Sequence, residues 1–321
     1  MKSVSHLTML IEGALLNHRY EIKKLVAKGG QCLVYLAQDL RDNRCNRIVK
    51  EMRNLYCDPT QQQKMITLFQ REAEILMRYD HLHLPEVFEL IEDEESCYIV
   101  EEYIEGKSLE EVLKERAVPL DHEEVAGMAR QLLCLLEFLH TLDPPILLRD
   151  IKPGNIVETK EGRLYFVDLT SARYWGPGQG DTVLIGSPGY APPEPYSGNS
   201  DPKSDIYALG ATMYRLATRY DPAKTPFLLP APRSLNPEIP PSMQRIILTA
   251  IQMNPEDRYS SARAMKEALE EAYPLLTRKG QTGGRKSVVF PGRVWVWALG
   301  TGGVAAFLAL MWTLLHHLKL Q

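Results

Sequence analysis

Cysteine is scarce in this sequence, and its spacing excludes two common roles. The 321 residues contain five cysteines, an odd number, and no two of them form a CxxC pair. A disulfide framework or a structural zinc site is therefore not expected, and reduced thiols suit a domain that works in the cytosol. The five are Cys32, Cys45, Cys57, Cys97 and Cys134.

Acidic residues are missing from the C-terminal end. No Asp or Glu follows Glu271, and residues 275–321 hold six of the 37 basic residues, which leaves 31 basic against all 41 acidic residues in the body. The body therefore carries −10 and the tail +6, for a total of −4. This total does not indicate a nucleic-acid-binding surface, and no nucleic-acid partner is expected. A mean hydropathy of −0.23 excludes a protein with many membrane spans.

Charged side chains are also absent from residues 294–318. A helix of about 20 apolar residues spans a bilayer core, so these 25 residues are long enough. Trp295, Trp297 and Trp312 lie near the two ends, where indole rings favour the membrane interface. The alternative is a buried core helix, which would show a polar stripe that this segment lacks. We therefore predict a transmembrane helix over residues 294–318.

Basic residues precede this helix in residues 275–293, which we predict to be a juxtamembrane linker. Short basic flanks stay in the cytoplasm, so the body is expected there, with residues 319–321 as a short extracytoplasmic end. The prediction is a single-pass membrane protein with a C-terminal anchor. The linker would attract an anionic lipid surface. Glycines within the span allow close helix packing, which would permit a homodimer through the membrane helix.

The body divides into two parts after an N-terminal extension, residues 1–19. Residues 20–104 favour short strands, with one helix over residues 60–79 whose apolar residues share a face. Residues 105–274 favour helices, and Asp121 with Glu124 resembles a capping box that opens a long helix through His140. Later helices are expected over residues 204–218, 242–251 and 261–273. The order predicts an α+β fold.

Four polar residues of the body have a characteristic spacing. Lys152 follows Asp150 by two residues and Asn155 follows it by five, while Asp168 ends an apolar run 13 residues beyond Asn155. Upstream, Lys50 ends a short strand pattern that comes after a pair of glycines. Each motif alone is weak evidence, but all of them occur here in one order.

In that order and spacing, the chain from about Leu15 to about Tyr273 resembles the protein kinases, and most closely the bacterial eukaryotic-type serine/threonine kinases. The resemblance implies a bilobal protein-kinase-like fold, with the N-lobe in residues 20–104 and the C-lobe in residues 105–274. It also implies transfer of the ATP γ-phosphate to protein hydroxyls, autophosphorylation included, in membrane-associated signalling. The expected partners are protein substrates.

The resemblance assigns catalytic roles to charged residues. Lys50 would bind the α- and β-phosphates of ATP, and Glu72 would pair with Lys50. Glu74 is the competing candidate, but it points about 200° around the helix from Glu72. Asp150 would orient the substrate hydroxyl and accept its proton. Lys152, which is typical of the serine/threonine class, would neutralise the γ-phosphate during transfer.

The resemblance also implies a metal site and an adenine site. Asn155 and Asp168 would supply oxygen ligands for Mg²⁺, with Mn²⁺ as a permitted alternative. Glu101 falls at the gatekeeper position, where a buried carboxylate needs a cationic partner or a raised pKa, and the sequence names no partner. The residues expected to contact the nucleotide are Ala27, Gly29, Gly30, Val34, Ile48, Lys50, Glu102, Ile104 and Val157.

Residues after position 186 resemble the end of an activation segment and the helix that follows it. Glu194 is expected to form a structural ion pair with Arg258. Asp205 is expected to hold the backbone of the catalytic loop.

Two hydroxyl groups in this region have open roles. Ser187 stands where the family often has Thr, and its hydroxyl is expected to bond Asp150 and Lys152. Thr182 is the best candidate for an activating phosphosite, because Arg149 would receive its phosphate. The equal alternative is a loop threonine that is never modified.

The sequence departs from the family at several positions. Ala27 and Cys32 replace two loop glycines, which should stiffen the loop and weaken ATP binding. Cys32 is expected at an exposed tip, where it is either oxidisable or an inert small residue. Leu148 replaces the usual His or Tyr before Arg149-Asp150. Thr170 replaces Gly and tolerates positive φ poorly, so the turn after Asp168 should flip less freely.

Two other functions remain open at this point. One is a catalytically weak or dead pseudokinase that serves as a nucleotide-binding membrane scaffold. We rank the pseudokinase below an active enzyme because every charged catalytic group of the family is present. The other is a small-molecule kinase of related fold, against which the peptide-docking segment around residues 186–194 argues.

Overall fold

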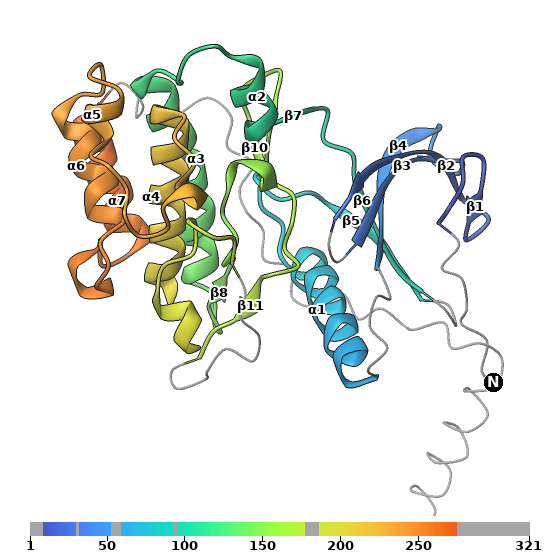
Figure 1. The fold of residues 1–321 in the computed structure, drawn as a ribbon. Coiled ribbons are helices and arrows are strands. Elements are labelled where there is room, and N and C mark those ends of the chain that lie inside the picture. Colours follow the sequence, from blue (N-terminus) through green and yellow to red (C-terminus); the bar gives the residue numbers. More distant parts are fainter. Residues whose placement is uncertain (1–8, 30–31, 53–58, 93–95, 177–185, 275–321) are drawn as a thin grey trace, which may run out of the picture. The chain divides into compact units, whose positions relative to one another are not determined.

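Six antiparallel strands form one sheet in the N-terminal part of the chain (Figure 1). The computed structural model describes residues 9–29, 32–52, 59–92, 96–176 and 186–274. The strand order is β1-β2-β3-β4-β6-β5. The strands are β1 (Leu15–Leu16), β2 (Tyr20–Lys28), β3 (Cys32–Asp39), β4 (Cys45–Met52), β5 (Val87–Glu92) and β6 (Cys97–Glu102).

The register of this sheet decides which side chains reach the site. Val34 of β3 pairs with Lys50 of β4, and Ile48 of β4 pairs with Glu101 of β6. Directly paired residues point to the same face, and so do residues two apart in one strand. All four side chains therefore share one face. The opposite face buries a separate apolar cluster that includes Tyr35.

One helix, α1 (Pro59–Arg78), packs on the face that carries Lys50. Phe69 and Ala73 of α1 share a buried cluster with Met52 of β4 and Ile99 of β6. Because Glu72 precedes Ala73, this packing brings its carboxylate to the sheet. The helix agrees with the predicted range to within one residue at each end.

The rest of the described chain is mainly helical and is built around α3. Asp121 caps α3 with a complete capping box to Glu124, as predicted. Leu133 of α3, Met213 of α4 and Leu269 of α7 are buried members of one large cluster. The helices are α2 (Leu109–Glu115), α3 (His122–His140), α4 (Pro202–Thr218), α5 (Pro232–Leu235), α6 (Pro241–Ala250) and α7 (Ala262–Ala272).

Short strands connect the two parts and shape the loops of the site. One three-stranded sheet contains β7 (Gly106–Ser108), β9 (Ile156–Thr159) and β10 (Leu164–Phe166), and a two-stranded one pairs β8 (Ile146–Leu147) with β11 (Arg173–Tyr174). At Gly106 a Cβ would lie 2.2 Å from the Glu158 carbonyl oxygen, so only glycine permits this pairing. The sequence patterns did not predict β7 or α2.

The predicted α+β, two-part order is thus confirmed for the described residues. The tail predictions, over residues 275–293, 294–318 and 319–321, lie outside those residues. Within the part that the structure describes, every helix is too short or too polar to cross a bilayer.

Candidate active site

Lys50 is buried at the centre of the site and has three acceptors. Its Nζ donates to Glu72 Oε1 at 2.7 Å and to the Val167 carbonyl oxygen at 2.7 Å. Glu101 Oε1 lies 3.0 Å from the same nitrogen. The predicted pair of Lys50 with Glu72 is therefore present, and the partner of Glu101 that the sequence left unnamed is Lys50 itself.

The charges around Lys50 shift its ionisation. Burial alone would lower the pKa of Lys50, but the nearby carboxylates, Glu101 and Glu72 above all, outweigh burial and raise it well above its usual value. Burial also raises the pKa of Glu101 to about 7, although the charge of Lys50 opposes that shift. Glu101 Oε2 is buried without a hydrogen-bond partner. Two carboxylates thus share one ammonium group.

Glu72 is fixed from two sides, whereas Glu74 faces away. Besides the bond from Lys50, Glu72 Oε2 accepts a hydrogen bond from the Thr170 hydroxyl at 2.7 Å. Glu74 is exposed, and its carboxylate accepts from the hydroxyl of Tyr174 at 3.3 Å. The structure therefore brings Glu72, not Glu74, to Lys50.

The loop between β8 and β9 is held by a buried carboxylate on α4. Asp205 accepts hydrogen bonds from the backbone N–H groups of Leu148 at 2.9 Å and Arg149 at 2.8 Å. Arg149 has a φ of +65°, a strained value for a residue other than glycine. The predicted role of Asp205 as the support of this loop is confirmed, and Leu148 is buried in the apolar core.

Asp150 projects from this loop and forms hydrogen bonds with three polar side chains. Lys152 Nζ donates to Asp150 Oδ2 at 2.7 Å, and Asn155 Nδ2 donates to the same oxygen at 3.0 Å. The Ser187 hydroxyl donates to Asp150 Oδ1 at 2.7 Å and accepts from Lys152 at 2.7 Å. The predicted contacts of Ser187 are therefore present, and they join the activation segment to the catalytic loop.

The β9–β10 hairpin brings the two predicted metal ligands together. Phe166 pairs with Ile156, and the Val167 N–H donates to the Asn155 carbonyl oxygen at 3.0 Å. Asn155 and Asp168 therefore flank one end of the hairpin. Among the described residues, no three His, Cys, Asp or Glu side chains form a group that could hold a metal ion. An amide and a carboxylate suit Mg²⁺, which usually takes its remaining ligands from phosphate and water.

The apolar residues predicted to cover a nucleotide remain partly accessible. Val34 and Ile48 from the sheet and Val157 from β9 are all half-buried, whereas Ala27 and Gly29 are exposed. Gly30 lies outside the described residues.

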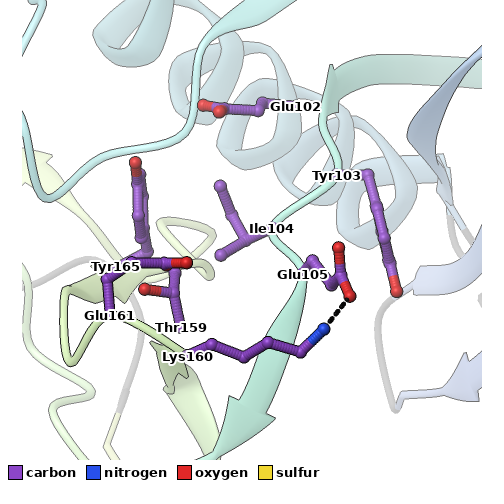
Figure 2. Close-up of a pocket in the computed structure, with 8 residues that line it drawn as sticks. All are labelled: Glu102, Tyr103, Ile104, Glu105, Thr159, Lys160, Glu161 and Tyr165. Atoms are coloured by element: carbon purple, nitrogen blue, oxygen red, sulfur yellow. Dashed lines mark hydrogen bonds and ion pairs between the residues drawn. The ribbon is translucent and has the colours of Figure 1, made fainter.

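A pocket of about 160 Å³ lies at the connection between β6 and β7 (Figure 2). It is lined by Glu102 and Ile104, two of the predicted nucleotide contacts, but not by Lys50, Asp150 or Asp168. Lys160 reaches across it to Glu105, as the dashed line in Figure 2 shows. The pocket therefore does not include the residues predicted to act in phosphoryl transfer. The full lining is Glu102, Tyr103, Ile104, Glu105, Thr159, Lys160, Glu161 and Tyr165.

One expectation about the unusual residues needs correction. Cys32 does not lie at an exposed tip: it begins β3, is half-buried, and packs beside the α1 cluster. Burial raises the pKa of its thiol to about 12, which favours the inert alternative. Thr170 does not adopt positive φ, so it causes no strain of that kind. Its hydroxyl bond to Glu72 was not predicted, although a hydroxyl residue directly after Asp168-Leu169 was the available signal.

The predicted ion pair beyond the activation segment is also present. Arg258 is buried and donates to Glu194 Oε1 at 2.5 Å and to Oε2 at 3.0 Å. A further bond, from Arg258 Nε to the Gln252 carbonyl oxygen at 2.7 Å, fixes the guanidinium group. The pair ties the segment after residue 186 to the loop before α7. Thr182 lies outside the described residues.

The strand sheet, the helical part and the polar site that joins them define a protein kinase domain. The family model for the protein kinase domain matches residues 20–273, and the chain belongs to this family. It is 30% identical over 313 residues to serine/threonine-protein kinase PksC of Streptomyces coelicolor, with 87% of this chain and 55% of that protein covered. It is 32% identical over 278 residues to serine/threonine-protein kinase PknA of Nostoc sp., with 80% and 48% covered.

Other relatives agree with this assignment. Serine/threonine-protein kinase PknL of Mycobacterium tuberculosis is 30% identical over 274 residues, with 81% of this chain and 67% of that protein covered. The crystal structure of the Mycobacterium tuberculosis PknI kinase domain matches with a TM-score of 0.65 at 22% identity, over 82% of this chain and 99% of that one. That similarity shows the bilobal fold. The chain spans about half the length of PksC and PknA.

Proposed function

We propose that this chain is a serine/threonine protein kinase that transfers the γ-phosphate of ATP to protein hydroxyl groups. The observation that carries the proposal is the contact set of Asp150, which joins Lys152, Asn155 and Ser187 at 2.7–3.0 Å. Phosphoryl transfer needs a positioned hydroxyl and neutralised phosphate charge more than covalent help from the protein. Family membership and the names of the relatives support this choice.

The proposed chemistry assigns one task to each side chain. Lys50, fixed by Glu72, would bind the α- and β-phosphates. Asp150 would accept the proton of the substrate hydroxyl while the new O–P bond forms and the bond from the γ-phosphorus to ADP breaks. Lys152 would neutralise the charge on the transferred group. The Ser187 hydroxyl, 2.7 Å from Asp150, already makes the kind of contact that a substrate hydroxyl would make.

The proposed metal ligands are Asn155 and Asp168, which would hold Mg²⁺ between them and the phosphates. The ion, when bound, would supply positive charge against the triphosphate. Val34, Ile48 and Val157 would enclose the adenine, and the backbone of Glu102 and Ile104 would bond its edge. These assignments extend the family resemblance to particular residues of this chain.

The test is phosphate transfer by the full chain in detergent with labelled ATP and Mg²⁺. Wild type should label itself and a generic protein acceptor, whereas Lys50→Met and Asp150→Asn should lose at least about 100-fold in rate. If the wild type transfers phosphate no faster than these variants, the proposed kinase activity is refuted. Nucleotide-dependent thermal stabilisation without turnover would instead support the pseudokinase scaffold. Labelling confined to a small metabolite would support a small-molecule kinase.

We further propose that residues 294–318 anchor the kinase in a membrane, with the catalytic body in the cytoplasm. The support is the run of 25 residues without Asp, Glu, Lys or Arg, together with five basic residues in the preceding linker. A homodimer through the helix and contact with anionic lipid are the expected consequences. Membrane fractionation and external protease access to a C-terminal tag test this. Recovery without membranes, or a tag cleaved only after cell lysis, would contradict it.

A further inference from the structure

Glu101 has an unusual position for a carboxylate group. Glu101 is buried, with 2% of its surface exposed. One oxygen lies 3.0 Å from Lys50 Nζ, and the other has no hydrogen-bond partner. Transfer of a charged carboxylate out of water is costly unless a cation compensates for it. Within the described part of the chain, Lys50 is the only cation that forms an ion pair with Glu101.

All three N–H donors of Lys50 already have an acceptor in this arrangement, so none is free to bind a nucleotide. An ammonium group has three N–H donors, and three acceptors lie within 3.0 Å of Nζ: Glu72 Oε1, the Val167 carbonyl oxygen and Glu101 Oε1. A phosphate oxygen that approaches Lys50 must displace one of them. Glu72 is fixed by a second bond from Thr170. Glu101 lacks such a second bond, so displacement from Lys50 leaves its buried carboxylate without a compensating cation.

We propose that Glu101 competes with nucleotide phosphate for Lys50 and thereby lowers the affinity of the site for ATP. The proposal rests on the proposed function, because it assumes that Lys50 binds the ATP phosphates. Glu101 does not touch the reacting atoms, so it acts as a positioning residue through Lys50. Release of Lys50 leaves the buried carboxylate without its cation, and that cost opposes nucleotide binding. In its ionised form, Glu101 also repels the incoming phosphates.

The test compares Glu101→Gln with a matched buried carboxylate, Glu51→Gln. Glu51 is 3% exposed and lies next to Lys50 in β4, but it points to the other face, where it accepts from the Tyr35 hydroxyl at 2.8 Å. Binding of a non-hydrolysable ATP analogue to the full chain in detergent is measured by titration calorimetry. Glu101→Gln should tighten binding by about fivefold or more, and Glu51→Gln should not.

Two further readouts keep the outcome decisive. A second variant, Glu101→Met, is measured in the same way, and a melting curve shows whether each variant folds. If one of them fails to fold, the other still tests the proposal. In steady-state assays the KM for ATP should fall more than kcat changes, which a purely structural effect would not produce. Unchanged or weaker binding in both variants, or no binding by any form, would overturn the proposal. Absence of phosphate transfer alongside tighter analogue binding would refute the proposed enzyme but leave this inference intact.

Discussion

The hydroxyl of Thr170 donates to Glu72 Oε2 at 2.7 Å and so connects the turn after Asp168 to helix α1. The same carboxylate holds Lys50 through its other oxygen, at 2.7 Å. Thr170 is thus linked to Lys50 through a single intermediate residue. A glycine at this position, as in the usual family motif, has no side chain to make this bond. The substitution that looks like a defect in the sequence therefore adds a support for Glu72.

Replacement of Thr170 by Val should slow phosphate transfer by about tenfold or more, because a hydrogen bond to a buried charged group contributes roughly 1.5–3 kcal/mol. Valine keeps the branched shape and removes only the hydroxyl. Thr170→Ser is the matched control and should keep most of the activity. Initial rates at saturating ATP measure the effect. Equal rates for the valine and serine variants would show that the hydroxyl does not matter.

Asp205→Asn should reduce both stability and activity. Asp205 is fully buried and accepts from the backbone N–H groups of Leu148 and Arg149, so an amide NH₂ in place of one oxygen sets a donor against a backbone donor. The expected loss is about 1–3 kcal/mol of unfolding free energy. It should come with a lower kcat, because the strained Arg149 backbone would lose its support. Chemical denaturation and initial rates measure the two effects.

Asp201→Asn is the control on the same helix. Asp201 caps α4 by accepting from Lys203 and Ser204 N–H groups and does not bond the catalytic loop. Asparagine is about as good an N-cap as aspartate. This variant should therefore keep its activity. A similar loss of kcat in both variants would indicate a general effect on α4 and not a specific role of Asp205.

The sequence was sufficient to predict elements with strong local signals. The capping box of Asp121 and Glu124 begins α3 where expected, and the apolar face of α1 located that helix to within one residue. By contrast, β7 has only three residues, and its pairing with β9 depends on a contact across about 50 positions of the chain. Local patterns contain no such information. Short elements defined by distant partners could not be predicted.

The site divides in the same way. The pairs of Lys50 with Glu72 and of Glu194 with Arg258 were predictable because the family motifs specify both partners. The partner of Glu101 could not be predicted, because it depends on the pairing of strands β4 and β6. That register sets Ile48 against Glu101 and Lys50 against Ile99. Side-chain bonds that no motif encodes, such as that of Thr170, require the three-dimensional arrangement.

Arg258→Met should be strongly destabilising. The buried guanidinium makes two bonds to Glu194 and three to backbone carbonyl oxygens, so its removal leaves a poorly compensated carboxylate. Loss of one partner of a buried pair typically costs about 3–5 kcal/mol. Urea denaturation measures the change. As a comparison, Arg263→Met removes an exposed pair with Glu267 and should leave the urea midpoint unchanged. Equal effects of the two substitutions would contradict the structural role of Arg258.

Acid should destabilise the fold through two buried histidines. Burial lowers the pKa of both His81 and His83 from 6.5 to about 4, so each stays neutral in the folded state while it becomes protonated in the unfolded chain. Between these values the unfolded state binds more protons, and stability therefore falls as the pH decreases from 6.5 toward 4. The loss is at most about 3 kcal/mol for each histidine.

His83→Asn isolates one of these contributions. The His83 ring nitrogen Nδ1 lies 2.8 Å from the Leu164 carbonyl oxygen, and an asparagine amide can donate to that oxygen without titrating. The free energy of unfolding should therefore decline less steeply in the variant than in wild type between pH 6.5 and 4. Above about pH 7.5 the two curves should run parallel, because His83 is neutral there in both the folded and the unfolded state. Parallel curves throughout the acid range would show that His83 is already protonated in the folded protein, or that it titrates alike in both states.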